Sequence, residues 1–400
     1  MDIPYRAMIP NDEMRQKALT ILETGISYGG EDTQRFETEL ARLCGTRYGV
    51  TANSGTSVML MALDALGIGP GDEVLMAANA YVGVAAAVIK AGATPIFVEA
   101  EGETANLRPD ATAAAVTERV RAIVPQHTYG FPCDMDPINE VARGLDLHVV
   151  EDAAHALGAR YKGRPAGSLG LVGIHSFSGK MITVFGPGGA AVTDDHRIAE
   201  SLASLRDQGR VRAEDISFVR RRDGAWYDLS FIGYNMHMTE ICAGLGRVQL
   251  RLLDDFIAHR RRAAAYYTER FRDAGLPLRL PPERPWANPS YLHYVVWTPL
   301  RDELREHLRD RGIQATIHYP SPLHLLGPVR ERFGTRPGQF PEAERLCREN
   351  LSLPVGPHMT DEMLARVADT IVGFFRHHLR PVHRAHRGGM TRCARPNCPY

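Results

Sequence analysis

Lysine is rare in this chain of 400 residues, where arginine supplies almost all of the fixed positive charge. Lys and Arg together number 47, yet the only lysines are Lys17, Lys90, Lys162 and Lys180. Codon bias is the simplest cause, but it has a chemical consequence, because arginine stays protonated and cannot act as an amine nucleophile. A lysine kept in such a chain is therefore a candidate for chemistry that needs an amine.

Lys180 has the most informative surroundings of the four. It ends the segment Ser176-Phe177-Ser178-Gly179-Lys180, and a Gly-Pro-Gly-Gly turn follows at 186–189. Small and hydroxyl residues let a backbone approach a ligand closely. Lys162, by contrast, lies in a polar loop that is typical of a solvated surface. A lysine amine has a reference pKa of about 10.4 and must be deprotonated, or already held as an imine, to react. Burial near a cationic ring would achieve that for Lys180.

Asp152 and His155 belong to the motif Glu-Asp-Ala-Ala-His, which follows directly on a short apolar stretch. A carboxylate at the end of a buried strand could hold a cationic ring nitrogen, and a histidine three residues later could contact the ring. Taken alone, Asp152 is more typical of a helix N-cap, and His155 of a hydrogen-bonded histidine of the core.

The sequence Asn-Ser-Gly-Thr at 53–56 precedes an expected helix. Backbone N–H groups and hydroxyls at a helix N-terminus bind anions, although the same residues also serve as an ordinary cap. The segment is not a Walker A loop, since no Gly-Lys-Ser/Thr follows. It is not a dinucleotide-binding fingerprint either, because the Gly-rich turn at 67–71 leads into a strand rather than out of one.

These three candidates together match the three chemical handles of pyridoxal phosphate (PLP). An anion-binding helix start fits its phosphate, Asp152 fits its ring nitrogen, and Lys180 fits its aldehyde. PLP enzymes pair a lysine Schiff base with an acidic partner of the pyridinium. The sequence therefore predicts PLP as the cofactor.

The elements that must position these residues alternate between helix and strand over residues 36–192. Short apolar strands separated by helices indicate a mostly parallel sheet covered by helices on both faces. Ligands bind at the carboxyl ends of such strands. The expected strands are 73–76, 94–98, 122–125 and 148–152, and the expected helices are 56–63, 81–91, 110–118 and 138–143.

A change in the sequence pattern near residues 255–275 predicts two domains. One long helix is expected at 247–272, then a Pro-rich stretch, then a strand at 294–297. We predict a PLP-binding large domain with an N-terminal arm (1–255), a small C-terminal domain (256–385) and a flexible tail (386–400). The tail's Cys393 and Cys398 lack a second pair of ligands, which argues against a metal site.

Composition excludes several classes of protein. Lys+Arg and Asp+Glu both number 47, so the formal charge is zero and a basic footprint for nucleic acid is absent in bulk. No stretch approaches the roughly 18 apolar residues of a membrane span. No secretory signal is recognisable, and six scattered cysteines fit a reducing cytoplasm, where we expect the protein to reside.

Many segments in order resemble the DegT/DnrJ/StrS sugar aminotransferases, a family of fold-type I PLP enzymes. The resemblance implies an α/β fold with a mostly parallel sheet in the large domain and a smaller C-terminal α+β domain. It extends over most of the chain, from about Pro4 to Leu379. The matching segments are 54–56, 66–74, 92–95, 129–130, 134–136, 151–159, 233–236, 238–240, 318–320, 323–324 and 352–354.

The resemblance also implies residue roles and a homodimer with shared active sites. Lys180 would hold PLP as a Schiff base, Asp152 would pair with the ring nitrogen, and His155 would contact the phenolic oxygen. Other cofactor-binding roles would fall to Ser54, Gly55, Thr56 and Ser176 at the phosphate, Tyr81 stacked on the ring, and Asn235 reaching the neighbouring subunit's phosphate. His324 would line the mouth for the substrate.

One segment departs from the family pattern. Relatives usually have one more residue between the phosphate-binding serine and the lysine, and an ungapped alignment would put Met181 at the lysine position. Methionine cannot form an imine, so we assign the role to Lys180.

The expected reaction is transamination from Glu or Gln to a keto-sugar, nucleotide-linked in many relatives, or to a keto-cyclitol, as in amino-sugar or antibiotic biosynthesis. Alternatives are an aromatic-precursor synthase, a lyase and a non-catalytic PLP-binding regulator. The run 220–222 of three arginines could face a nucleotide diphosphate, although such a run is more typical of a solvated surface.

Overall fold

The computed structural model describes residues 2–8, 10–210, 229 and 231–378. The arginine run at 220–222, the tail at 386–400, and both of its cysteines lie outside the described residues. The domain limits given above stay a prediction.

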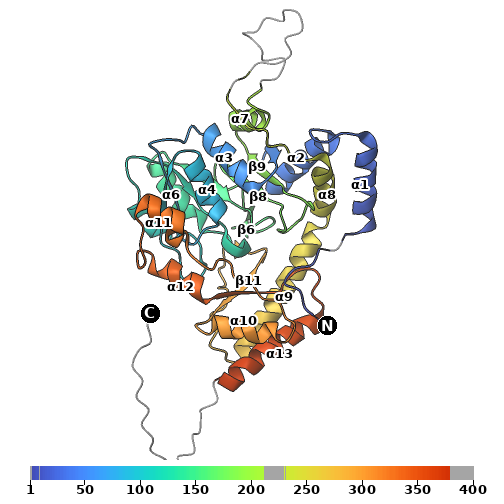
Figure 1. The fold of residues 1–400 in the computed structure, drawn as a ribbon, viewed down its shortest axis with the longest axis vertical. Helices are drawn as coiled ribbons and strands as arrows, with labels where there is room; N and C mark the ends of the chain where they lie inside the picture. Colours follow the sequence, from blue (N-terminus) through green and yellow to red (C-terminus); the bar gives the residue numbers. More distant parts are fainter. Residues whose placement is uncertain (1, 9, 211–228, 230, 379–400) are drawn as a thin grey trace, which may run out of the picture.

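A seven-stranded sheet forms the centre of the large domain (Figure 1). Its strand order is β1-β9-β8-β5-β4-β2-β3. Strands β8, β5, β4, β2 and β3 pair in parallel, whereas β9 runs antiparallel to both β1 and β8. The strands are β1 (Tyr48–Ala52), β2 (Glu73–Ala77), β3 (Thr94–Val98), β4 (Val120–Val124), β5 (His148–Asp152), β8 (Val172–Ser176) and β9 (Gly189–Thr193). The mostly parallel α/β fold is thereby confirmed.

Helices pack around this sheet and supply most of the remaining core. Those of the large domain are α1 (Asp12–Thr24), α2 (Glu31–Cys44), α3 (Gly55–Ala65), α4 (Val82–Lys90), α5 (Pro109–Ala114), α6 (Met135–Gly144), α7 (His196–Arg206) and α8 (Glu240–Arg251). Helix α5 is shorter than the expected 110–118. The chain must turn there to enter β4, and the hydroxyl of Thr117 donates to the buried carboxylate of Glu73 in that turn.

The expected helix at 247–272 is wrong, because it is two helices, α8 and α9 (Leu253–Asp273). They meet at Leu252, and the sequence there contains neither Gly nor Pro to mark the break. Leu253 packs into the large-domain core with Phe177, whereas Phe271 packs in the small domain. The break lets the chain change direction between these two cores.

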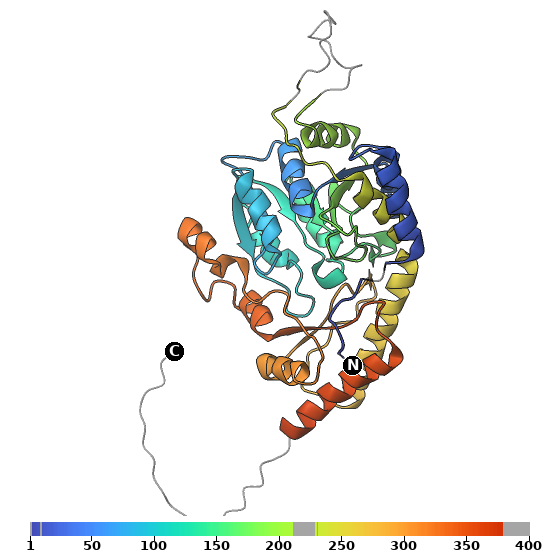
Figure 2. The same ribbon diagram turned by 45° about the vertical axis from the view of Figure 1, so that its right-hand side comes forward.

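The small domain packs around its own apolar cluster, which includes Tyr267, Phe271, Phe374 and Phe375. Ile3 from the amino terminus belongs to the same cluster, so the first residues lie beside α9 and α13 in both views (Figures 1 and 2). The elements of this part of the chain are β11 (Tyr294–Trp297), α10 (Arg301–Arg309), α11 (Gly327–Phe333), α12 (Pro341–Glu349), β12 (Asn350–Leu353) and α13 (Asp361–His378). Helices α11 and α12 pack against the large-domain core instead, through Val329, Ala343 and Leu346. Short strands β6 (Arg160–Tyr161), β7 (Arg164–Pro165) and β10 (Ala287–Asn288) form a third sheet.

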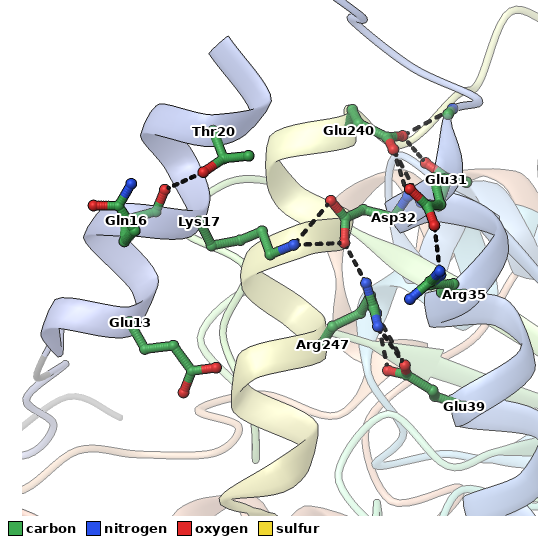
Figure 3. Close-up of polar contacts among 12 residues, drawn as sticks. Glu13, Gln16, Lys17, Thr20, Glu31, Asp32, Arg35, Glu39, Glu240 and Arg247 are labelled. Atoms are coloured by element: carbon green, nitrogen blue, oxygen red, sulfur yellow. Dashed lines mark hydrogen bonds and ion pairs between the residues drawn. The ribbon is translucent and has the colours of Figure 1, made fainter. Parts of the chain in front are cut away.

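A charged network fastens α1 to α2 and α8 (Figure 3). The amine of Lys17 lies 3.2 Å from a carboxylate oxygen of Asp32, which also pairs with Arg247 at 2.5 Å; Arg247 in turn reaches Glu39 at 2.7 Å. This ion pair gives Lys17 a structural reason to persist. Lys162 likewise pairs with Asp136 on the surface, as its loop predicted.

Glu240 caps the start of α2 from the neighbouring helix α8. Its side chain is buried and accepts hydrogen bonds from the backbone N–H groups of Gly30 and Asp32 at 2.9 and 2.6 Å and from the hydroxyl of Thr33 at 2.6 Å. The N-cap residue Gly30 has no side chain that could do this. Removal of the carboxylate would leave several buried donors unsatisfied.

We therefore expect Glu240→Ala to lower the free energy of unfolding by about 3 kcal/mol, measured by denaturant titration. The matched control is Glu31→Ala at the first residue of α2, whose exposed ion pair with Arg35 should contribute below about 0.5 kcal/mol. Equal effects of the two substitutions would contradict the capping role.

Candidate active site

A cavity of about 190 Å³ opens at the carboxyl ends of the central strands. Its lining contains residues that lie far apart in the sequence but follow β1, β2, β5 and β8. The predicted site residues found in this lining are Ser54, Gly55, Thr56, Tyr81, Asp152, His155, Ser176 and Lys180. The structure thus brings eight of the predicted residues to one place, at the sheet edge where ligands of such folds bind.

One end of the cavity is formed by the N-terminus of α3. Ser54 is the N-cap, and its hydroxyl accepts a hydrogen bond from the backbone N–H of Ser57 at 3.0 Å. Gly55 begins the helix against β8, where a Cβ would lie only 2.9 Å from Cβ of Ser176. The missing side chain lets the free N–H groups of the helix and the Ser176 hydroxyl face the same space. That arrangement suits a phosphate dianion.

Asp152 ends β5 and is 4% exposed. It does not cap a helix; its carboxylate accepts one hydrogen bond, from the backbone N–H of Ala154 at 3.0 Å. Burial raises the pKa of Asp152, while this bond and the charge of Lys180 act in the opposite direction. A carboxylate so poorly solvated favours a cationic partner within the cavity.

The preceding residue, Glu151, shows the contrasting case. It is fully buried and accepts hydrogen bonds from the His127 ring at 2.8 Å and from the N–H groups of Gly167 and Gly170 at 2.8 and 2.6 Å. Burial raises the pKa of Glu151, but these bonds outweigh it and hold the pKa below its ordinary value. Because side chains alternate along a strand, Glu151 points away from Asp152. Its carboxylate oxygens are already engaged by these donors and are not available to a ligand.

Lys180 places its amine in the cavity, 5.6 Å from the ring centroid of Tyr81. Burial lowers the pKa of Lys180 from 10.5 to about 8; the charge of Asp152 raises it and that of Arg6 lowers it further. The neighbouring Met181 is buried in an apolar cluster instead. The structure therefore puts the amine, and not the thioether, among the cavity residues despite the unusual loop spacing.

His155 lines the same cavity, and both nitrogens of its ring have hydrogen-bond partners. Its Nδ1 accepts from the backbone N–H of Tyr129 at 3.3 Å, and its Nε2 lies 3.2 Å from the hydroxyl of Tyr319. Burial, followed by the charge of Lys180, lowers the pKa of His155 well below 6.5. The ring is thus neutral, and since Nδ1 accepts a hydrogen bond, the proton resides on Nε2.

Two positioning residues were not singled out from the sequence. Gln126, after β4, accepts a hydrogen bond from the backbone N–H of Tyr81 at 2.7 Å and so fixes the start of α4. Tyr319 packs its ring 5.5 Å from that of Tyr81 and bonds to His155. A polar residue following a buried strand is the signal that could have identified Gln126.

Two predicted residues lie outside this cavity lining. Asn235 is exposed and pairs with Asp207 through a backbone bridge. His324 is fully buried, and its ring lies 3.1 Å from the Glu344 carboxylate and edge-on to Phe340. Its neighbours Leu323 and Leu346 pack into the core of the large domain, and a role of His324 at the substrate mouth stays a prediction.

The described part of the chain contains no group of three His, Cys, Asp or Glu side chains that could hold a metal ion. Among the helices that the structure describes, none is long and apolar enough to cross a membrane. The four described cysteines, Cys44, Cys133, Cys242 and Cys347, are free thiols. The cytoplasmic location stays a prediction.

The lowered pKa of Lys180 has a direct consequence for its reactivity. In cofactor-free protein, the rate of acetylation of Lys180 by acetic anhydride should rise with pH with a midpoint near 8, because only the neutral amine reacts. Exposed Lys162 is the internal control. Its hydrogen bond to Asp136 raises its pKa, so its acetylation should rise at higher pH than that of Lys180. Asp152→Asn should move the Lys180 midpoint to lower pH, because the carboxylate that favours the ammonium is lost. Peptide mass spectrometry measures each site; coincident profiles for the two lysines would contradict the burial of the amine.

Comparisons with known proteins agree with this geometry. Residues 9–372 match the DegT/DnrJ/EryC1/StrS aminotransferase family. The erythromycin biosynthesis sensory transduction protein EryC1 of Saccharopolyspora erythraea is 36% identical, over 93% of this chain and 99% of that protein. The dTDP-3-amino-3,4,6-trideoxy-alpha-D-glucose transaminase of Streptomyces venezuelae is 40% identical, over 88% of this chain and 89% of that protein.

A solved structure has the same fold. The crystal structure of S. venezuelae DesV in complex with a ketimine intermediate is 39% identical and superposes with a TM-score of 0.84, covering 90% of this chain and 94% of that chain. The family match spans most of the chain, and the relatives are matched over nearly their whole length. The resemblance inferred from sequence motifs is confirmed: the chain belongs to the DegT/DnrJ/EryC1/StrS aminotransferase family.

Proposed function

We propose that this protein is a PLP-dependent transaminase that moves the amino group of Glu or Gln to a nucleotide-linked keto-sugar or to a keto-cyclitol. The observation that carries the proposal is the joint burial of the Lys180 amine and the Asp152 carboxylate in one cavity that ends at the N-terminus of α3. An amine with a pKa near 8, a lone carboxylate and an anion site are the three groups that PLP requires.

The residues present fit the cofactor in chemistry and in order. Thr56, Ser176 and the free N–H groups of α3 would hold its phosphate, Tyr81 would cover its ring, and Asp152 would accept a hydrogen bond from its ring nitrogen. When bound, PLP supplies an electron sink that stabilises negative charge on the carbon bearing the amine. Asp152 would keep the ring nitrogen protonated, because a buried carboxylate stabilises an adjacent cation.

Lys180 has two tasks in this proposal. Its amine would hold the cofactor's aldehyde until an amino-acid donor replaces it. Once released, the neutral amine is available as a base because burial keeps its pKa near 8. It would move a proton from the donor's α-carbon to the cofactor carbon that is bonded to the same nitrogen. The second half of the reaction would use the same proton transfer in reverse on the acceptor.

The choice of acceptor class rests on similarity. The S. venezuelae relative is a transaminase of a dTDP-linked amino sugar, and DesV was crystallised with a ketimine intermediate, which is the imine of a ketone. We therefore favour a nucleotide-linked keto-sugar over a cyclitol. EryC1 carries the name of a sensory transduction protein, so a regulator without turnover is the competing function.

We also propose a homodimer with shared active sites. Large apolar side chains are exposed on α1 and around Asn235, among them Leu19, Leu22, Phe231 and Ile232, the last 90% exposed. Apolar surface of this extent fits a protein interface better than solvent. Exposed Asn235 at its edge could then reach the cofactor phosphate of the partner subunit.

Reduction with borohydride tests the covalent link to PLP. Protein loaded with PLP and reduced should carry the cofactor on Lys180 alone, and with four lysines in the chain the peptide map is unambiguous. Lys180→Ala should lack the absorption band of the lysine-bound cofactor, and its activity should be at least about 10³-fold lower than that of wild type. Lys162→Ala should change neither the band nor the activity. Label on another lysine would refute the assignment.

Incubation with glutamate separates a transaminase from a regulator. The band of the lysine-bound cofactor should shift to that of the pyridoxamine form, with one equivalent of 2-oxoglutarate released per site. A panel of dTDP-linked keto-sugars and scyllo-inosose, each added to the pyridoxamine form, then identifies the acceptor by return of the original band. A band that glutamate leaves unchanged, with PLP bound, would favour the regulator.

Mixed dimers test the sharing of sites. Lys180→Ala and Asn235→Ala homodimers should each have little activity, Lys180→Ala for lack of the amine and Asn235→Ala for weaker phosphate binding. Subunit exchange between them should restore up to about a quarter of wild-type activity, because half the dimers then contain one intact site of two. Ile232→Asp should reduce dimerisation in sedimentation equilibrium. Mixtures no more active than their parents would show that Asn235 does not act across the interface.

A further inference from the structure

The first residues of the chain form a strap that runs from the small domain to the lysine loop. Ile3 bridges to Ile313: its N–H donates to the carbonyl of Gly312 at 2.8 Å, and its carbonyl accepts from Gln314 at 2.9 Å. The carbonyl of Pro4 accepts from the His358 ring at 3.0 Å. The strap is therefore fixed to the small domain at its start, and Figure 2 shows the amino terminus beside α13.

Its next two residues lie beside the lysine loop and the histidines next to it. The hydroxyl of Tyr5 lies 2.5 Å from Nδ1 of His293, and its ring lies below the guanidinium of Arg6 at 5.9 Å. Arg6 donates through Nη1 to the carbonyl of Gly179, the residue directly before Lys180. Gly179 has a positive φ of 61°, and a Cβ there would lie 2.7 Å from Nη1 of Arg6, so glycine is what permits the approach.

The charges around Lys180 are unbalanced once Arg6 is counted. Asp152 is the one carboxylate that affects the pKa of Lys180, and Arg6 affects it as a second cation. His155, His293 and His318 surround the same space but are neutral, since burial and the nearby cations lower the pKa of each. Among the described residues, Arg6 has no carboxylate within ion-pair distance. Its Nη2 and Nε remain available as a fork of donors.

From this placement we propose that Arg6 binds the α-carboxylate of the amino-acid donor. The inference rests on the proposed transaminase function. A donor that replaces the lysine amine must bring its own nitrogen to the place of Nζ of Lys180, and its α-carboxylate lies one carbon from that nitrogen. Arg6 is bonded to the peptide that carries Lys180, and guanidinium groups bind carboxylates through paired N–H donors. Arg6 is thus a specificity-determining residue supplied by the N-terminal strap.

Titration of the lysine-bound cofactor band with donors tests this role. For Arg6→Gln, we expect the half-saturating concentration of glutamate to rise about 10- to 100-fold, the loss expected for a charge-assisted hydrogen bond. For Arg6→Lys, the half-saturating concentration of glutamate should lie between those of wild type and Arg6→Gln, because lysine keeps the positive charge but lacks the paired N–H donors. 2-Methylglutamate has no α-hydrogen and so binds without being turned over. Its half-saturating concentration should rise by the same factor from wild type to Arg6→Gln. With 4-aminobutanamide, an amine without a carboxylate, wild type and Arg6→Gln should not differ.

Gln314→Ala is the matched control, because it removes a hydrogen bond to the backbone of Tyr5 in the strap and leaves the guanidinium in place. Its half-saturating concentration of glutamate should lie within about threefold of the wild-type value, which allows for the loss of one neutral hydrogen bond. Equal glutamate binding by Arg6→Gln and wild type would overturn the proposal, as would equal losses for glutamate and 4-aminobutanamide. Weaker binding of dTDP with unchanged glutamate binding would assign Arg6 to the acceptor and also overturn it. If glutamate does not alter the wild-type band, the proposed function fails rather than Arg6's role in it.

Discussion

The site depends on the burial of a lysine amine beside an aspartate in a space with little other solvation. Burial lowers the pKa of Lys180 to about 8 and raises that of Asp152. Each group is thereby made more reactive toward a partner: the amine is available as a nucleophile near neutral pH, and the carboxylate favours a cation. Neither property exists in a solvated loop, so the sheet edge that buries both residues is the precondition for the chemistry.

Adjacent carboxylates on β5 show how the fold separates structural from reactive groups. Glu151 and Asp152 are both buried, but only Glu151 receives a full set of donors, from His127 and from the turn at 167–170. Its saturated hydrogen bonds hold that turn and the end of β5 in place. Asp152 on the other face is left with one backbone donor. Rigidity on one face of the strand thus maintains an unsatisfied acceptor on the other.

The sequence predicted much of this because its signals were local. The strand 148–152 and the helices near α3 and α4 follow from apolar runs bounded by turn residues, and scarcity of lysine drew attention to Lys180. The break at Leu252 could not be predicted, since no helix breaker marks it and only the two separate cores on either side demand it. The surroundings of His324 were hidden for a related reason, because its motif does not reveal the contact of its ring with Glu344, twenty residues later.

Residues that act across domains were the hardest to recognise from sequence. Arg6 lies 173 positions before the carbonyl of Gly179 that it contacts, and no pattern near the amino terminus indicates that distance in the fold. The contact exists because Ile3 packs into the small-domain core, whereas the lysine loop follows β8 of the large-domain sheet. A strap fastened to one domain and bonded to a loop of the other makes the position of Arg6 depend on how the two domains are packed. Donor recognition and domain arrangement would therefore be coupled through a single guanidinium, whereas the cofactor contacts lie on the large domain alone.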